Sequence, residues 1–209
     1  MGLSMGTMNP RIPPINHSAV LVHKDPIWTS FQVPYKDPSM NKCLSNMIFV
    51  MQKEPCPDRS ITQMWLGLSD PEAVWTDDML PIGCDMFVPS LENFYPDSDR
   101  SIQSFARQSL EWAEKGVTAQ HRETEWKLPR WYTTVNMTVE VKRALPKEGV
   151  RWLFTKMKVN EVVDGRLDVQ GWVWDERGRF LALAQYQWFV VESERAVVNK
   201  ATRERTNKM

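Results

Sequence analysis

Hydrophobic and polar residues alternate through much of the C-terminal half of the chain. In residues 131–143, WYTTVNMTVEVKR, the side chains of Val135, Met137, Val139 and Val141 fall on one face of an extended chain, and mostly polar residues fall on the other. This period of two is typical of a half-buried β-strand. Three more strands are predicted by similar runs, at residues 150–163 (VRWLFTKMKVNEVV), 166–175 (RLDVQGWVWD) and 180–192 (FLALAQYQWFVVE).

The segments between these runs are short and rich in turn residues. Asp164-Gly165 predicts a tight turn, and DERGR, which contains Gly178, predicts another. Short turns favour antiparallel pairing, so we expect a four-strand antiparallel meander. The last run is apolar on both faces, which predicts a central strand covered on both sides.

The first part of the chain has a different character. Residues 1–45 are rich in Pro, Asn, Ser and Lys and are expected to be an extended loop, with a possible edge strand at Ala19–Val22. Strands are predicted at 46–52 and 61–69.

Helical spacing of apolar residues then predicts a short, mostly buried helix within 79–95. A more exposed helix is predicted at 100–115, and a charged, frayed or helical tail at 193–209. Strands that precede and follow a buried helix predict an α+β fold.

Composition narrows the possible functions. The 209 residues include 26 basic and 26 acidic side chains, so the net charge gives no indication of binding to nucleic acid or to an anionic membrane. Three cysteines without CxxC spacing argue against a disulfide framework or a zinc site. The N-terminus has no apolar signal segment, and a cytoplasmic location is expected. The 10 tryptophans indicate either a thick core or an aromatic-walled ligand cavity.

Four segments, in this order, resemble the hotdog-fold acyl-CoA thioesterase superfamily. They are WLGLSD, DDMLPIGCDMFVP, TTVNMTVEVKR and GWVWDERGRFLALAQYQWFVV. The likeness is greatest to the C-terminal half of type II acyl-CoA thioesterases and to fungal thioesterase-like biosynthetic proteins. It implies an antiparallel sheet wrapped around a central helix. It also implies a hotdog domain at 61–192, preceded by an extension or incomplete first hotdog at 1–60.

The resemblance implies a site built from three side chains that hold the attacking water. The helix Asp corresponds to Asp85, at the expected start of the helix, and the strand Thr to Thr134. The Gln position of the family falls on Tyr186, and a one-residue gap would restore Gln185. This chain also has Asn136 and Met137 where the family has an Asp-His pair.

The residue types suit thioester hydrolysis. A carboxylate surrounded by apolar side chains, as expected for Asp85, would have a raised pKa and would be a better base near neutral pH. Backbone N–H groups at Gly83 and Cys84 are candidates to face the developing oxyanion. Substrate contacts are expected from the following side chains: Tyr186, Gln187, Trp172, Trp174 and Trp188.

Each assignment has an alternative reading. Asp85 could be a solvated helix residue or cap, Thr134 an ordinary strand residue, and Gln185 or Gln187 a backbone partner. Cys84 as a nucleophile would need a nearby His. Asp77, Asp78 and Asp85 have no accompanying His, so neither a metal nor another cofactor is predicted.

Three functions remain open on the sequence alone. The lead is hydrolysis of an acyl-CoA or of a carrier-bound acyl or polyketide thioester. One alternative is dehydration, isomerisation or cyclisation of a polyketide, with Asp85 and Tyr186 as acid and base. The other is a non-catalytic module that binds an apolar ligand. Burial of an open sheet edge predicts a homodimer, and the alternative is a monomer in which residues 1–60 cover the sheet.

Overall fold

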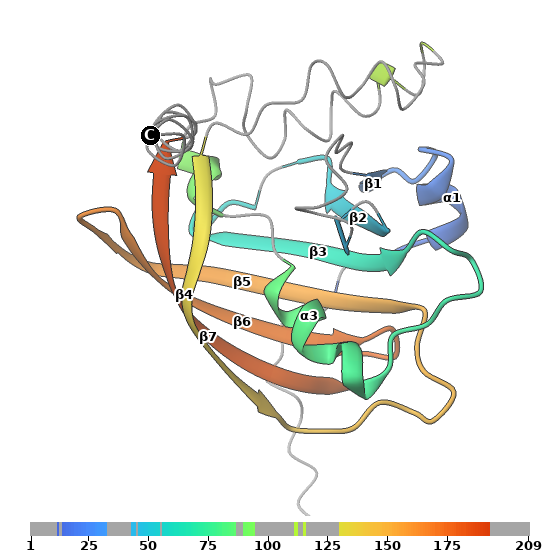
Figure 1. Cartoon of the computed structure of the whole chain (residues 1–209). Coiled ribbons are helices and arrows are strands. Elements are labelled where there is room, and N and C mark those ends of the chain that lie inside the picture. The colour runs from blue at the N-terminus through green and yellow to red at the C-terminus, as the bar shows by residue number, and fades with distance from the viewer. Residues whose placement is uncertain are drawn as a thin grey trace, which may run out of the picture.

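The computed structural model describes residues 12, 14–32, 43–44, 46–54, 56–86, 90–94, 111–112, 115 and 130–192. These residues form one seven-stranded sheet in which every pair of neighbouring strands is antiparallel (Figure 1). The strands are β1 (Trp28–Phe31), β2 (Met47–Gln52), β3 (Ile61–Leu68), β4 (Arg130–Val141), β5 (Trp152–Val163), β6 (Arg166–Asp175) and β7 (Phe180–Glu192). The helical elements are α1 (His17–Leu21), η1 (Asp77–Met79), α3 (Leu80–Asp85) and η2 (Ser90–Phe94).

The strand order across the sheet is β1-β2-β3-β5-β6-β7-β4. The predicted four-strand meander is therefore wrong for its first strand, because β4 pairs with β7 and not with β5. The β5–β6 and β6–β7 connections are tight turns, whereas residues 142–151 are long enough to carry the chain across the sheet to β5. Asp164 and Gly165 both have positive φ, at 49° and 76°, as a two-residue type I′ hairpin requires.

Most predicted strands are confirmed, but the N-terminal one is not. Ala19–Val22 contributes to α1 and its end, not to a strand. The side chain of Asn16 accepts a hydrogen bond from the backbone N–H of Ala19 at 3.1 Å, and this N-cap starts the helix.

The predicted central helix is also shorter than expected. α3 ends at Asp85, and residues 90–94 form the separate 3₁₀ element η2. The tail at 193–209 and almost all of the helix expected at 100–115 lie outside the described residues.

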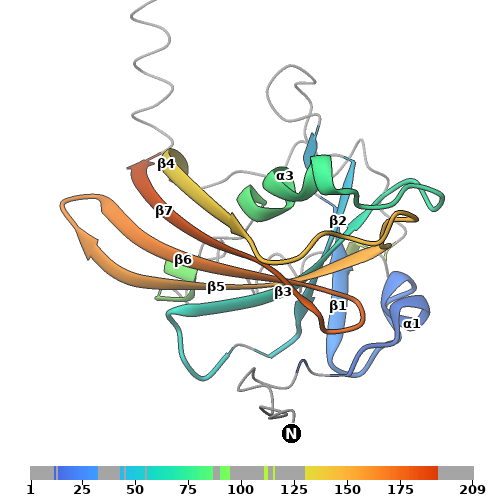
Figure 2. The same cartoon turned by 90° about the horizontal axis from the view of Figure 1, so that it is seen from below.

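Two hydrophobic clusters lie on opposite faces of the sheet. On the inner face, Leu80 and Cys84 of α3 pack with Leu153, Val173 and Tyr186. On the outer face, α1 and β1 cover a cluster that is rich in tryptophan: Val20, Trp28, Val50, Trp65, Trp152, Phe154 and Trp174. α3 and α1 consequently lie on opposite sides of the sheet, which curves around α3 (Figure 2). An α+β fold with an antiparallel sheet around a central helix is confirmed.

The outer cluster also shows what the described part of residues 1–60 does. β1 and β2 continue the same sheet beyond β3, and α1 packs on its outer face. By contrast, the second half of β7 is covered on its inner face but not on its outer face. Tyr186 and Trp188 are buried there, whereas Gln185, Gln187 and Phe189 are exposed, so the expectation of two covered faces is wrong for this half.

The loop between β3 and α3 is fixed by side chains from distant parts of the chain. Trp75 forms a two-way backbone bridge with Val150, and its indole donates to the carbonyl of Leu66 at 3.2 Å. The Arg151 guanidinium donates to the carbonyl oxygens of Asp70 and Ala73, at 2.6 Å each. Because these contacts fix the start of α3, they also fix where its last residue points.

Candidate active site

The carboxylate of Asp85 meets the hydroxyl of Thr134 on the inner face of the sheet. Thr134 Oγ1 donates to Asp85 Oδ1 at 3.0 Å, across 49 positions of sequence. Burial raises the pKa of Asp85, because desolvation disfavours the charged carboxylate, and the Thr134 hydrogen bond lowers it in part. The result is a half-buried acid, held by a hydroxyl and more basic than an exposed aspartate.

A β-bulge in β4 brings Thr134 to this face. Simple alternation would place Thr134 and Met137 on opposite faces, because they are three positions apart. The register shifts between Thr134 and Asn136, so Val135 is an extra residue in the strand. Thr134 therefore pairs with buried Trp188, while Met137 pairs with buried Tyr186.

The bulge also corrects the face assignment made from the sequence. The period of two groups Val135 with Met137 and Val139 on the inward face, but Val135 is 54% exposed. It lies on the outer side next to Gln187, whose Cα partner is Asn136. Bulges are frequent beside active sites because they redirect one side chain without ending the strand.

Tyr186, on which the resemblance places the Gln position, lies on the inner face of β7. Its hydroxyl donates a hydrogen bond to the carbonyl oxygen of Cys84, the residue before Asp85. Tyr186 is only 2% exposed, and desolvation raises the pKa of its phenol far above the ordinary value. This geometry links Tyr186 to the backbone of α3, whereas the sequence predicts a contact with substrate.

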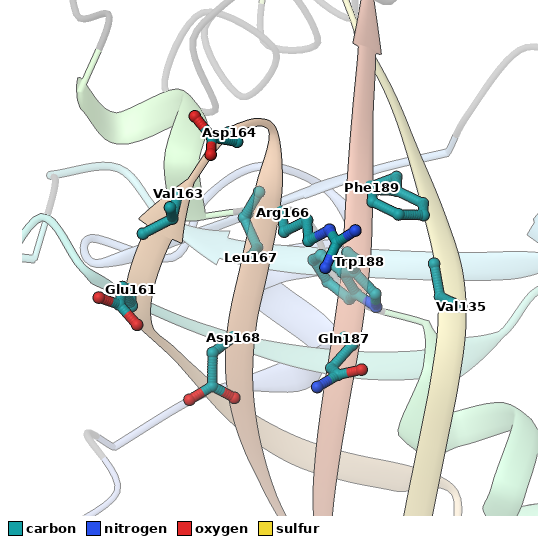
Figure 3. A pocket seen from close by; sticks show the side chains of 10 residues that line it. All are labelled: Val135, Glu161, Val163, Asp164, Arg166, Leu167, Asp168, Gln187, Trp188 and Phe189. Carbon is teal, nitrogen blue, oxygen red and sulfur yellow. The ribbon is translucent and has the colours of Figure 1, made fainter.

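The structure does not bring either neighbouring glutamine to Asp85. Gln185 and Gln187 are both exposed on the outer face, because they flank the inward Tyr186 in a regular strand. Gln187 lines a cavity of about 900 Å³ at this end of the sheet, together with Glu161, Asp168 and other residues (Figure 3). The cavity lies mainly on the side of the sheet that faces away from α3.

Gly83 and Cys84 lie in the second half of α3, not at its start, and Asp85 is its last residue. The helix begins at Leu80, inside the predicted range and with Pro81 in its first turn, so the expectation that Asp85 lies near its start is wrong. Gly83 and Cys84 are both buried. Burial raises the pKa of the Cys84 thiol to about 12, which opposes formation of a nucleophilic thiolate.

The three tryptophans expected to wall the site separate between the two faces. Trp174 belongs to the outer cluster, and Trp172 packs against that cluster with Lys156 over its ring. Only Trp188 lies on the inner face, where its ring contacts those of Tyr132 and Tyr186. The sequence alone groups these three tryptophans by residue type, but their positions in the alternating strands place them on different faces of the sheet.

A buried ionic cluster beside the site was not foreseen. Arg130 donates to both carboxylate oxygens of Glu92, at 3.1 and 3.0 Å, and the Tyr132 hydroxyl donates to the same carboxylate. Glu92 is 2% exposed. No local sequence pattern indicates that Arg130 and Glu92, which are 38 positions apart, form a pair. The one available signal is the position of Glu92 within the predicted, mostly buried helix at 79–95.

Comparison with known proteins assigns the fold and the family. A hot dog fold protein of Alicyclobacillus acidocaldarius is similar in structure, with a TM-score of 0.55 and 17% identity, over 90% of this chain and 56% of that one. The profile of the family described as "Acyl-CoA thioesterase C-terminal domain" matches residues 22–190. The chain belongs to this family and has the hotdog fold, as the resemblance implied.

One relative in a fungus is similar in sequence. The thioesterase-like protein TwmA of Talaromyces wortmannii is 26% identical over 180 residues, which cover 85% of this chain and 50% of that protein. The chain thus spans about half the length of this relative. Within the described part of the chain, no helix is long and apolar enough to cross a membrane.

Proposed function

We propose that the chain hydrolyses an acyl thioester, with Asp85 as the general base that activates water. The observation that carries this proposal is the contact between Asp85 and Thr134, made by two residues from separate elements. Membership of an acyl-CoA thioesterase family supports a thioester as the substrate class. CoA is the first expected donor, and a carrier protein that bears an acyl or polyketide chain is the second.

The reaction requires one base and one placed water. Asp85 takes a proton from the water, whose oxygen forms a bond with the thioester carbonyl carbon. The Thr134 hydroxyl keeps the carboxylate oriented, which favours attack through proximity. The carbon–sulfur bond then breaks, and Asp85 returns the proton to the leaving sulfur, giving a free thiol and a carboxylic acid.

A panel of acyl-CoAs, assayed for release of free thiol, tests the proposal. Asp85→Asn should lower kcat by at least about 100-fold, since a general base contributes roughly 10²–10⁴-fold. Asp78→Asn is the matched control, because Asp78 is exposed in the preceding 3₁₀ turn. Equal, slow rates for wild type and Asp85→Asn on every chain length would exclude hydrolysis.

A second candidate is acid–base chemistry on a polyketide without net hydrolysis. It is favoured by one observation, that Tyr186 and not a glutamine amide occupies the inner position beside α3. The fungal relative is itself named thioesterase-like. Mass spectrometry of a carrier-bound polyketide incubated with the protein would separate the two functions. Loss of the acyl group indicates hydrolysis, and an altered chain still on its carrier indicates the alternative.

We further propose a homodimer formed through β4. This strand is at the edge of the sheet, and two of its exposed residues are Val135 and Val141, at 54% and 57%. Among the described residues no strand pairs with its outer edge, and an unpaired edge with apolar side chains favours pairing with another strand. Light scattering after gel filtration gives the mass directly, and a monomer at micromolar concentration would contradict this proposal.

A further inference from the structure

We propose that the indole N–H of Trp188 donates a hydrogen bond to the carbonyl oxygen of the bound thioester. The proposal rests on the proposed function, and it adds a catalytic residue that the family pattern does not contain. It gives this chain a replacement for the side-chain donor that Gln185 and Gln187 do not supply on the inner face.

The first observation is a buried donor without an acceptor. Trp188 is 3% exposed, and its Nε1 is shielded from solvent with no hydrogen-bond partner in the described part of the chain. Buried polar groups in folded proteins are almost always paired, and an unpaired one costs about 1–3 kcal/mol. An unpaired donor beside a candidate site can therefore bind a ligand oxygen, once the ligand displaces the side chains that shield the nitrogen.

The second observation is position. The Cα partner of Trp188 in the neighbouring strand is Thr134, which holds the Asp85 carboxylate. Residues directly opposite in antiparallel strands have Cβ atoms roughly 4.5–5.5 Å apart and share a face. The side chain of Trp188 thus stands next to the hydroxyl that orients the proposed base.

The third observation is orientation. The indole packs between the rings of Tyr132 and Tyr186, with centroids 6.1 and 5.6 Å away. Figure 3 shows its nitrogen on the side of β4, the strand that carries Thr134. Two aromatic contacts fix the ring, so the N–H direction is set before a ligand binds.

The chemistry of hydrolysis uses such a donor. The carbonyl oxygen gains negative charge as water attacks, and a preorganised N–H stabilises that charge more than it stabilises the ground-state carbonyl. Asp85 cannot fill this role, because a carboxylate only accepts hydrogen bonds when ionised. The base, Asp85, and the donor, Trp188, are then separate groups, and both lie next to Thr134.

An unpaired indole alone would not identify a site, because a second tryptophan has the same feature away from the proposed site. Trp174 is also 3% exposed, and its Nε1 also lacks a partner among the described residues. It belongs to the outer cluster, on the far side of the sheet from α3. Of these two tryptophans, Trp188 alone combines the unpaired donor with the Asp85–Thr134 pair, and Trp174 serves as a matched control.

The test compares two ligands that differ in the carbonyl. One is a non-hydrolysable acyl-CoA analogue that keeps a ketone at the carbonyl position, and the other is an alkyl-CoA thioether without it. The variants are Trp188→Phe and Trp174→Phe. A second form of residue 188 carries benzothienylalanine, in which sulfur replaces the indole N–H and the shape is kept. Calorimetry gives Kd, thiol release gives kcat, and thermal unfolding checks that each variant is folded.

We expect both changes at position 188 to weaken ketone binding by about tenfold, as for loss of one neutral hydrogen bond, with thioether binding nearly unchanged. We also expect kcat to fall by about 100-fold, as for an oxyanion donor. Trp174→Phe should change neither. Equal losses for the two ligands, or no loss with benzothienylalanine, would overturn the role of Trp188 while leaving hydrolysis intact. If wild type binds neither ligand and releases no thiol, the proposed function itself fails, and the role of Trp188 fails with it.

Discussion

The Tyr186 hydroxyl donates a hydrogen bond to the carbonyl oxygen of Cys84, and so connects the centre of β7 to the end of α3. The last carbonyls of a helix have no partner within the helix. Here a buried strand residue supplies one of those partners, directly before Asp85. The position of the proposed base is therefore set by the sheet as well as by its own short helix.

Replacing Tyr186 by Phe should separate this positional role from packing. The ring is kept, and one buried hydrogen bond is lost. We expect the free energy of unfolding to fall by about 1–2 kcal/mol, and kcat to fall by about tenfold with little change in KM, because Asp85 loses its fixed geometry. Chemical denaturation and steady-state thiol release measure the two effects.

Ser30→Ala is the matched control for Tyr186→Phe. Ser30 also donates a hydroxyl to a buried backbone carbonyl, that of Val20 at 3.1 Å, but it lies in β1, far along the sheet from β7. A similar loss of stability without a loss of kcat is expected. If both variants lose kcat equally, Tyr186 contributes only to general stability.

Thr134→Val should move the acid limb of the pH–rate profile. Asp85 acts as a base only when ionised, so the rate rises with pH through its pKa. The Thr134 hydrogen bond lowers that pKa, against the raising effect of burial. Removing the hydroxyl should therefore shift the rise in kcat/KM to higher pH, and should lower its plateau by about tenfold because the carboxylate is no longer oriented.

The control for Thr134→Val is Thr138→Val in the same strand. Thr138 is exposed and pairs with Gln185 on the outer face. Its replacement should leave the profile in place. An unchanged or downward-shifted acid limb in Thr134→Val would show that Asp85 is not the titrating base.

The sequence was sufficient for the strands but not for which residues meet on the inner face. Alternation located β5, β6 and β7 to within two residues at each end, because their side chains follow a regular period of two. The bulge at Val135 breaks that period without a Gly or another local signal, so the orientation of Thr134 was not predictable from spacing. The pairing of β4 with β7 likewise depends on tertiary packing.

The same reasoning explains the misplaced glutamines. A one-residue gap in a family comparison is a small change in sequence, but it moves a side chain through the sheet to its other face. The expectation that Gln185 belongs to the site depends on that gap. The buried Tyr186 between the two exposed glutamines fixes the register and leaves no gap.

Gln185→Ala and Gln187→Ala give a direct check of this register. Both side chains are exposed on the face away from α3, so each variant should keep kcat within about twofold of wild type. Exposed substitutions of this kind usually change stability by roughly 0.5 kcal/mol or less. Thiol-release assays on the preferred acyl-CoA suffice. A loss of kcat of tenfold or more in Gln185→Ala alone would restore it as a site residue.

Gly83→Ala tests whether α3 must approach the sheet as closely as it does. A Cβ at position 83 would lie 2.8 Å from Leu153 Cδ1 and 3.4 Å from the Trp75 ring. Alanine favours the helix by about 0.8–1 kcal/mol, but overpacking costs about 1–3 kcal/mol, so we expect a net loss of stability. The helix must also shift outward, which moves Asp85 and should lower kcat by about tenfold to 100-fold.

A second substitution isolates the cause of that loss. Leu153→Val removes one carbon from the side chain that a Cβ at position 83 would meet, at a cost of about 1 kcal/mol by itself. If the clash is responsible, the double variant should be more stable than the sum of the two single effects, and part of the lost kcat should return. Strict additivity in urea unfolding and in kcat would mean that α3 accepts the methyl group without moving, and that its distance from the sheet does not control Asp85.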